Sequence, residues 1–345
     1  MTGDAPEVVC VGETMVLFAP VDPEPLERAG SIGVHTAGAE SNVAMYLAGL
    51  GHRVSWVSRL GDDPFGQRVL RDVTAAGVST SLVELDASAP TGFFFKDPGP
   101  HGTDVFYYRR GSAASLMTAR MLAPVFASPP RVVHLSGITP VLSPSCDEMM
   151  DRVFAEFAGT ATLVSFDVNF RPGLWSPREA GPRLRELAQR ADVVFAGLDE
   201  ACRLWGTRTP GELRQLLPQP TVLVVKDGAN GATAFEEAGE VFVRSLRVEV
   251  SEPVGAGDAF AAGWLSGLLR DLLPAQRLRL GHLLAGVAMG STADYQAPPP
   301  PDLVSAALEA SETAWEEGPA AWGDGWVWPR SPAPRWEADG WVDMS

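Results

Sequence analysis

A glycine-rich segment at residues 253–260 could supply both an anion site and a base. Gly255 and Gly257 let the backbone turn tightly and approach a ligand closely. The apolar run at 259–269 predicts a buried helix that begins near Asp258. The first turn of a helix presents unpaired amides that suit a phosphate, and a carboxylate there can take a proton from a hydroxyl. These residues alone fit equally well a simple turn in which the aspartate caps the helix.

Polar side chains also follow a strand predicted at residues 162–167. Asp167, Asn169 and Arg171 alternate where the chain leaves the carboxyl end of that strand. In α/β folds this end of the sheet borders the ligand crevice. An arginine there can hold a carboxylate or a phosphate through two parallel hydrogen bonds. A solvated arginine that closes a strand is the simpler alternative.

A third segment has spaced glycines after a strand predicted at 221–226. Lys226, Gly228 and Gly231 occur within six residues of one another. Without side chains, the glycine backbone can lie against an adenine or a nucleotide phosphate. A hairpin turn into a strand at 233–236 is the alternative explanation of the glycines.

A fourth segment, residues 37–42, opens a helix predicted at 41–50. Gly38 brings the backbone near a ligand, and Glu40 and Asn42 offer partners to substrate hydroxyl groups. The alternative is an ordinary helix start.

The elements that must position these residues alternate between strand and helix. Near-continuous apolar strands of this kind form a mainly parallel sheet covered by helices on both faces, so the predicted fold class is α/β. Further predicted strands lie at 7–11, 53–58, 131–136 and 192–196, and further predicted helices lie at 184–190 and 278–289.

Residues 14–36 and 91–110 interrupt this alternation. Their Pro/Gly-rich turns and strand-like pieces predict a small β-sheet that forms a lid over the ligand site, with an exposed face suited to homo-oligomer formation. Tyr107 and Arg109 would offer a small polyol acid an aromatic wall and a cation there, although a solvated edge strand is the alternative. The strand-like pieces lie at 16–18, 93–95 and 105–108.

The end of the chain departs from the pattern. We predict one domain over residues 1–300 and a C-terminal segment, 301–345, made of a helix and a tryptophan-rich tail. Because six solvated indoles would be unfavourable, we expect the tryptophans of this tail to pack on the parent domain. They are Trp315, Trp322, Trp326, Trp328, Trp336 and Trp341, six of the ten in the chain.

Composition limits the class of protein. The chain has 345 residues, is 46% hydrophobic and 20% charged, and carries a formal charge of −16. These values indicate a globular protein and argue against a nucleic-acid surface, which needs a clustered basic face. Three scattered cysteines without metal-like spacing favour reduced thiols. No signal segment or bilayer-length apolar stretch is recognisable, so we expect a cytoplasmic protein without membrane association.

Taken together, the four segments and their order resemble the PfkB, or ribokinase-like, carbohydrate kinases, from about residue 7 to about residue 300. Residues 37–42 and 255–258 are the most specific matches. The sequence has no Walker A motif and no G-x-G-x-x-G after its first strand, which weakens other nucleotide-binding interpretations. Within the family the chain looks most like the 2-keto-3-deoxygluconate kinases, on residues 38–40, 61–66, 105–109, 167–172 and 253–263.

The resemblance implies a ribokinase-like fold and phosphoryl transfer from ATP, with Mg²⁺, to a primary hydroxyl of a sugar acid. The implied product of 2-keto-3-deoxygluconate is its 6-phosphate. Asp258 would be the base, and the amides of Gly255, Ala256 and Gly257 would form the anion hole.

The same resemblance assigns the remaining site residues. Arg109 and Arg171 would face the carboxylate of the sugar acid, and Glu200 would help to organise Mg²⁺. The residues that would hold the sugar are Gly38, Glu40, Asn42, Phe94, Tyr107, Arg109, Arg171 and Asp294. Those that would line the ATP cleft are Asn169, Lys226, Gly228 and Gly231.

Three residues depart from the family pattern. Phe94 stands where a tyrosine is common, which removes one hydroxyl contact and leaves the exact sugar open. Glu252 replaces an aspartate before Pro253, and Gly197 replaces the asparagine of the Asn-x-x-Glu element that ends at Glu200. A kinase for a neutral sugar such as fructose or ribose is therefore an alternative. A catalytically idle sugar or nucleotide sensor that has kept the fold is another.

Overall fold

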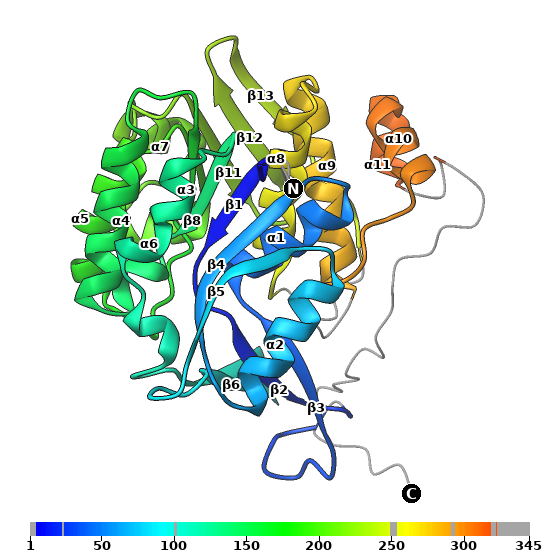
Figure 1. The fold of residues 1–345 in the computed structure, drawn as a ribbon. Coiled ribbons are helices and arrows are strands. Elements are labelled where there is room, and N and C mark those ends of the chain that lie inside the picture. The colour runs from blue at the N-terminus through cyan, green and yellow to red at the C-terminus, as the bar shows by residue number, and fades with distance from the viewer. Residues whose placement is uncertain are drawn as a thin grey trace, which may run out of the picture.

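A computed structural model describes residues 5–22, 24–99, 102–248, 254–290 and 294–318, together with Trp322. Its main body is a nine-stranded sheet with helices on both faces, and a separate four-stranded sheet lies beyond one end of it (Figure 1). The predicted α/β class, the mainly parallel sheet and the additional small sheet are confirmed. Among the described residues, no helix is both long enough and apolar enough to cross a membrane.

The large sheet gathers the carboxyl ends of its parallel strands at one edge. Neighbouring strands from β11 to β5 all pair in parallel, whereas β12 and β13 add an antiparallel hairpin at one side. The spatial order is β13 (Gly239–Val243), β12 (Gly231–Glu236), β11 (Val222–Asp227), β10 (Val193–Gly197), β9 (Leu163–Asp167), β8 (Val132–Ser136), β1 (Val8–Val11), β4 (Val54–Gly61) and β5 (Ser79–Asp86).

Alternate side chains of the buried strands enter two separate cores. In β1, Val8 and Cys10 belong to one core and Val9 and Val11 to the other, as the two-residue period of a strand requires. The first core contains residues of α1 (Ala39–Gly49), α2 (Pro64–Ala75), α8 (Ala256–Leu269), α9 (Pro274–Met289) and α10 (Pro301–Glu309). The second contains residues of α3 (Ala123–Ala127), α4 (Pro144–Phe157), α5 (Pro177–Arg190), α6 (Leu198–Trp205) and α7 (Pro210–Leu216).

Local capping explains where several of these helices begin. The side chains of Asp63, Ser143 and Ser176 each accept a hydrogen bond from a first-turn amide of α2, α4 and α5, and a proline follows each of them. The predicted helix at 184–190 is therefore only the second half of α5, which starts at its Ser176 cap.

The small sheet grows from the carboxyl ends of β1 and β5. Its strands are β3 (Ile32–Ala37), β2 (Met15–Pro20), β6 (Phe93–Gly99) and β7 (Gly102–Tyr108), in that spatial order. The chain enters β2 four residues after β1 ends and enters β6 seven residues after β5 ends. The small sheet is consequently held beside the ligand-binding edge of the large sheet, at the bottom of Figure 1.

The C-terminal segment adds α10 and a short helix, α11 (Glu312–Glu317). Trp315 is 3% exposed in the first core, and Trp322 stacks on it with ring centroids 5.2 Å apart. The expected packing of the tryptophans holds for these two. The other four lie outside the described residues.

Candidate active site

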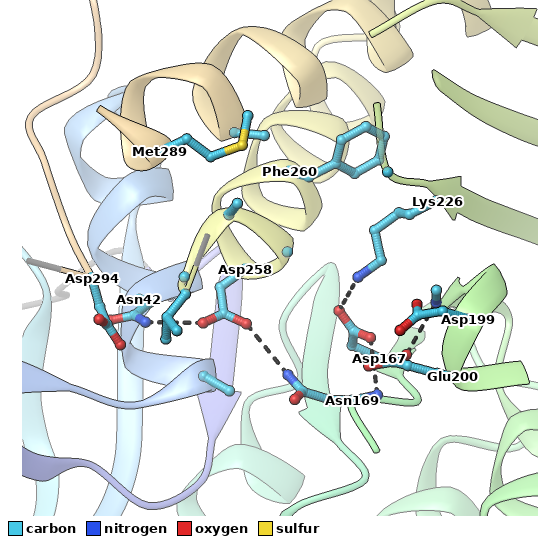
Figure 2. A pocket seen from close by; sticks show the side chains of 18 of the residues that line it. Asn42, Asp167, Asn169, Asp199, Glu200, Lys226, Asp258, Phe260, Met289 and Asp294 are labelled. Atoms are coloured by element: carbon cyan, nitrogen blue, oxygen red, sulfur yellow. Dashed lines mark hydrogen bonds and ion pairs between the residues drawn. The ribbon is translucent and has the colours of Figure 1, made fainter. Parts of the chain in front are cut away.

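A cavity of about 1310 Å³ lies between the small sheet and the carboxyl edge of the large sheet. One end is lined by Met15, Phe94 and Tyr107 of the small sheet, and the other end reaches the β11–β12 turn and α9. All seventeen residues predicted for the site line it, so the fold brings them together. Figure 2 shows several of them converging on the start of α8.

The start of α8 is built around Gly255. This residue has φ = +87°, a left-handed conformation that a side chain disfavours. A Cβ there would also lie 2.7 Å from the backbone oxygen of Asp294. Because first-turn amides have no acceptor within their own helix, those of Ala256 and Gly257 are available to an anion in the cavity.

Asp258 is the buried carboxylate of this helix start. Its Oδ2 accepts a hydrogen bond of 2.9 Å from Nδ2 of Asn42, and its Oδ1 accepts one of 3.4 Å from Nδ2 of Asn169 (Figure 2). Burial raises the pKa of Asp258 to about 7, although the bond from Asn42 and the charge of Arg171 lower it. A carboxylate with that pKa is matched to accepting a proton near neutral pH.

The two asparagines leave acceptors for a ligand. Oδ1 of Asn42 and Oδ1 of Asn169 are buried, and neither has a hydrogen-bond partner among the described residues. Asn169 also has φ = +40°, a conformation that costs free energy for a residue with a side chain. Unpaired buried acceptors beside a base fit a ligand whose hydroxyl groups donate hydrogen bonds.

A lysine and two carboxylates lie beside the same helix start. Nζ of Lys226 bonds Oδ2 of Asp167 at 2.9 Å and stands 3.3 Å from where a Cβ of Gly257 would be. Burial lowers the pKa of Lys226, but the charges of Asp167 and Glu200 outweigh burial and raise it, so the ammonium keeps its proton. A fixed cation therefore borders the amides that the sequence predicts as an anion site.

Glu200 lies at the start of α6, where its Oε2 accepts the amide of Gly197 at 3.0 Å. Among the described residues, no group of three or more His, Cys, Asp or Glu side chains could hold a metal ion. Mg²⁺ is commonly held by one or two carboxylates together with phosphate oxygens and water. Glu200 and Asp167 fit such a supporting role.

The two arginines predicted for the site differ in their pairing. The guanidinium of Arg109 forms an ion pair with the buried Glu13, whose Oε1 also accepts a bond of 2.5 Å from Ser112. Arg171 has no ion pair within 4.0 Å in the described part of the chain and is held by longer-range attraction to Asp258. Arg171 thus retains its full hydrogen-bonding capacity for a ligand.

A second buried ion pair joins the small sheet to the start of α8. Nζ of Lys96, on β6, bonds Oδ1 of Asp294 at 2.9 Å, and both side chains are at most 6% exposed. Asp294 in turn packs against Gly255. The interpretation of the sequence missed Lys96 and Glu13, although Lys96 is one of only two lysines and Glu13 follows the first strand.

Three predicted sugar contacts also have structural duties. Glu40 is 1% exposed, and its Oε1 accepts bonds from Ser136 and Thr139. A Cβ on Gly38 would meet the backbone oxygen of Glu13 at 2.5 Å. Phe94 is buried against the ring of Tyr107, with centroids 5.3 Å apart. Phe94 therefore adds an apolar wall to the cavity.

The predicted ATP glycines lie in the hairpin between β11 and β12. Gly231 has φ = +141°, and a Cβ there would lie 2.3 Å from the backbone oxygen of Val243, so β13 already requires a glycine at this position. Gly228 has φ = +50° with open space around it. The hairpin alternative for these glycines is correct, and both residues also line the cavity.

A cleft that brings helix-start amides, a lysine and a buried carboxylate together has the groups that phosphoryl transfer uses. The model for the pfkB family carbohydrate kinases matches residues 5–300, and the chain belongs to that family. It is a carbohydrate kinase with a ribokinase-like fold.

Individual proteins agree with this assignment. A 2-dehydro-3-deoxygluconokinase of Thermoproteus tenax is 33% identical over 310 residues, covering 88% of this chain and 94% of that protein. The crystal structure of a PfkB protein from Polaromonas sp. JS666 is 36% identical with a TM-score of 0.76, covering 84% of this chain and 98% of that one. A putative ribokinase II from E. coli, solved in complex with ATP and Mg²⁺, has a TM-score of 0.80 at 19% identity, over 88% of this chain and 99% of that chain, and therefore shares the fold.

Proposed function

We propose that this kinase transfers the γ-phosphoryl group of ATP to the primary hydroxyl of 2-keto-3-deoxygluconate and releases ADP and the 6-phosphate. The observation that carries the proposal is the meeting of Asp258, with its pKa of about 7, and the anion site of α8 in one cavity. The name of the Thermoproteus tenax relative supports the choice of sugar acid.

The chemistry assigned to the chain is proton transfer and charge stabilisation. Asp258 accepts the proton of the attacking hydroxyl, whose oxygen forms a bond to the γ-phosphorus as the bond from phosphorus to the bridging oxygen of ADP breaks. Asn42 and Asn169 hold the carboxylate, and their free Oδ1 atoms accept hydrogen bonds from the sugar. The amides of Ala256 and Gly257 bind the charge that builds on the phosphoryl oxygens.

The remaining residues orient the two substrates. Lys226 lies against the phosphates, and the β11–β12 hairpin borders the nucleotide. Mg²⁺, when bound, would neutralise charge on the phosphates. Glu200 and Asp167 would hold it through one or two contacts. Arg171 pairs with the carboxylate of the sugar acid through two parallel hydrogen bonds.

One observation favours a neutral sugar such as fructose or ribose as a second candidate. Because Glu13 already neutralises Arg109, only Arg171 remains for a substrate carboxylate among the two predicted arginines. The balance between an acidic and a neutral sugar therefore depends on Arg171.

We also propose that the small sheet acts as a lid over the cavity and as a dimer surface. Its face away from the cavity carries the aromatic cluster of Phe18, Phe93, Phe95 and Tyr108, with Tyr108 56% exposed. Phe18 and Phe93 also contact Phe65 of α2, so the exposed ring of Tyr108 is what supports pairing with a second copy. The three free cysteines support a reducing compartment, the cytoplasm.

A coupled ADP-release assay with ATP and Mg²⁺ tests the function across 2-keto-3-deoxygluconate, 2-keto-3-deoxygalactonate, gluconate, fructose and ribose. We expect the highest kcat/KM with the first sugar acid and a loss of that preference in Arg171→Met. A preference for fructose or ribose in the parent enzyme would favour the neutral-sugar candidate. No turnover with any acceptor would favour a sensor.

A further inference from the structure

The cavity has two ends that the sheet topology separates. The small sheet is attached after β1 and β5, whereas the hairpin β11–β12 and strand β13 lie at the opposite side of the large sheet. The end near β13 is lined by apolar side chains such as Leu246, Phe260 and Met289. On the proposed function, on which this inference rests, this is the end that takes the adenine.

One wall of that end is a non-strand segment, residues 244–248, which follows β13. Its first residue is held by α11 of the C-terminal segment. Nε1 of Trp315 donates a hydrogen bond of 2.9 Å to the backbone oxygen of Arg244, and Nε of Arg244 pairs with Glu316 at 3.1 Å. Glu316 itself lines the cavity.

Trp315 is firmly anchored for a residue so near the end of the described chain. The guanidinium of Arg279, on α9, lies 5.3 Å from its ring centroid and also donates to the backbone oxygens of Leu308 and Ala310. Trp322 also stacks on Trp315, with ring centroids 5.2 Å apart, and donates from Nε1 to the backbone oxygen of Ala314 at 2.7 Å.

Ring contacts continue from Trp315 into the cavity. The ring of His282 lies 6.5 Å from that of Trp315 and 5.1 Å from that of Phe260, and His282 and Phe260 both line the cavity. His282 also bonds the backbone oxygen of Val243 at 3.1 Å, directly before the 244–248 wall. Trp315 thus contacts both the 244–248 wall and His282, whose ring contacts Phe260.

We propose that α11 is part of the nucleotide site: Trp315 positions the 244–248 wall and His282 against the adenine. The family model ends at residue 300, so this element lies beyond the part of the chain that defines the family. Trp315 acts as a positioning residue, because it reaches the cavity only through the wall and His282.

The test compares Trp315→Phe with Trp205→Phe in the full-length protein. Trp205 is a matched control because its Nε1 donates to the backbone oxygen of Gly181 at 2.8 Å, in the other core. Calorimetry with ADP gives nucleotide affinity without any sugar, and steady-state kinetics give KM for ATP and for the sugar separately. Thermal melting checks that each variant is folded.

We expect Trp315→Phe to weaken ADP binding and to raise KM for ATP by about three- to tenfold, the effect of one lost, partly buried hydrogen bond to the backbone. KM for the sugar and kcat should change less than about twofold in Trp315→Phe, and Trp205→Phe should leave every parameter unchanged. A folded Trp315→Phe with unaltered ADP affinity, or with equal losses for sugar and nucleotide, overturns the inference.

A second variant covers the case in which Trp315→Phe does not fold. Trp322→Ala removes only the outer ring of the stack and should weaken ADP binding in the same direction, whereas unchanged affinity overturns the inference. If the parent protein binds ADP but phosphorylates no sugar, the proposed function fails and the role of α11 stands. If it binds no adenine nucleotide, both fail.

Discussion

Replacing Asp258 with asparagine tests two effects of this carboxylate, one on turnover and one on the stability of the fold. The substitution keeps the shape of the side chain and removes the base, so turnover should fall by about two to four orders of magnitude. Nucleotide affinity should change little, since the helix-start amides and Lys226 remain in place. In the parent enzyme, kcat/KM should rise with pH through about 7, because the carboxylate must be ionised to accept a proton.

The same carboxylate makes folding dependent on pH. Its pKa rises from 3.8 to about 7 on burial, so the folded state holds a proton that the unfolded state releases between these values. Stability should therefore fall as pH rises through that window, and the fall between pH 5 and pH 8 is roughly 2–3 kcal/mol. The asparagine of Asp258→Asn does not titrate, so this fall in stability is absent from the variant. Its free energy of unfolding minus that of the parent should therefore increase by roughly 2–3 kcal/mol between pH 5 and pH 8.

Urea unfolding at pH 5, 6, 7 and 8 measures this difference, and the ADP-release assay measures turnover. Asp271→Asn is a suitable control because it removes an equivalent charge from an exposed position with φ = +56°, which asparagine tolerates. An Asp258→Asn variant that keeps full turnover would refute the base. If the free energies of unfolding of the parent and of Asp258→Asn change with pH in parallel, the argument that burial raises the pKa of Asp258 is refuted.

Three further substitutions test other parts of the site. Arg171→Met should raise KM for the sugar acid about 10- to 100-fold and, because Arg171 lowers the pKa of Asp258, should move the acid limb of the pH–rate profile to higher pH. Lys96→Met leaves Asp294 buried without its partner and should cost roughly 3–5 kcal/mol in urea unfolding. Gly255→Ala forces a side chain into φ = +87° against Asp294 and should lower kcat about 100-fold or more by displacing the anion-site amides.

Each of these has its own control. Arg171→Lys keeps the charge, so it should restore the pH profile but not the two parallel hydrogen bonds. Adding Asp294→Asn to Lys96→Met should recover much of the lost stability, and no recovery would contradict the pairing. Gly51→Ala tests backbone strain alone, because that glycine lies outside the cavity and has φ = +91° in open space; equal losses at positions 51 and 255 would contradict the packing argument.

Much of the fold could be predicted from local sequence. Buried parallel strands such as β1 and β10 are short apolar runs, and this pattern is independent of their neighbours. β5 was missed because it is an edge strand of mixed polarity, and its conformation depends on pairing with β4. The start of α5 was missed because it depends on the cap at Ser176 rather than on apolar spacing.

The sequence by itself determined which residue types meet at the carboxyl edge of the sheet, because polar residues that follow parallel strands converge there whatever their separation along the chain. It therefore indicated Asn169 and Lys226 as one group, and the resemblance to the PfkB kinases added Asp258. Only the tertiary structure decided how each charge is paired. Arg109 is neutralised by Glu13 while Arg171 remains available, since ion pairing depends on distances of a few ångströms between distant segments.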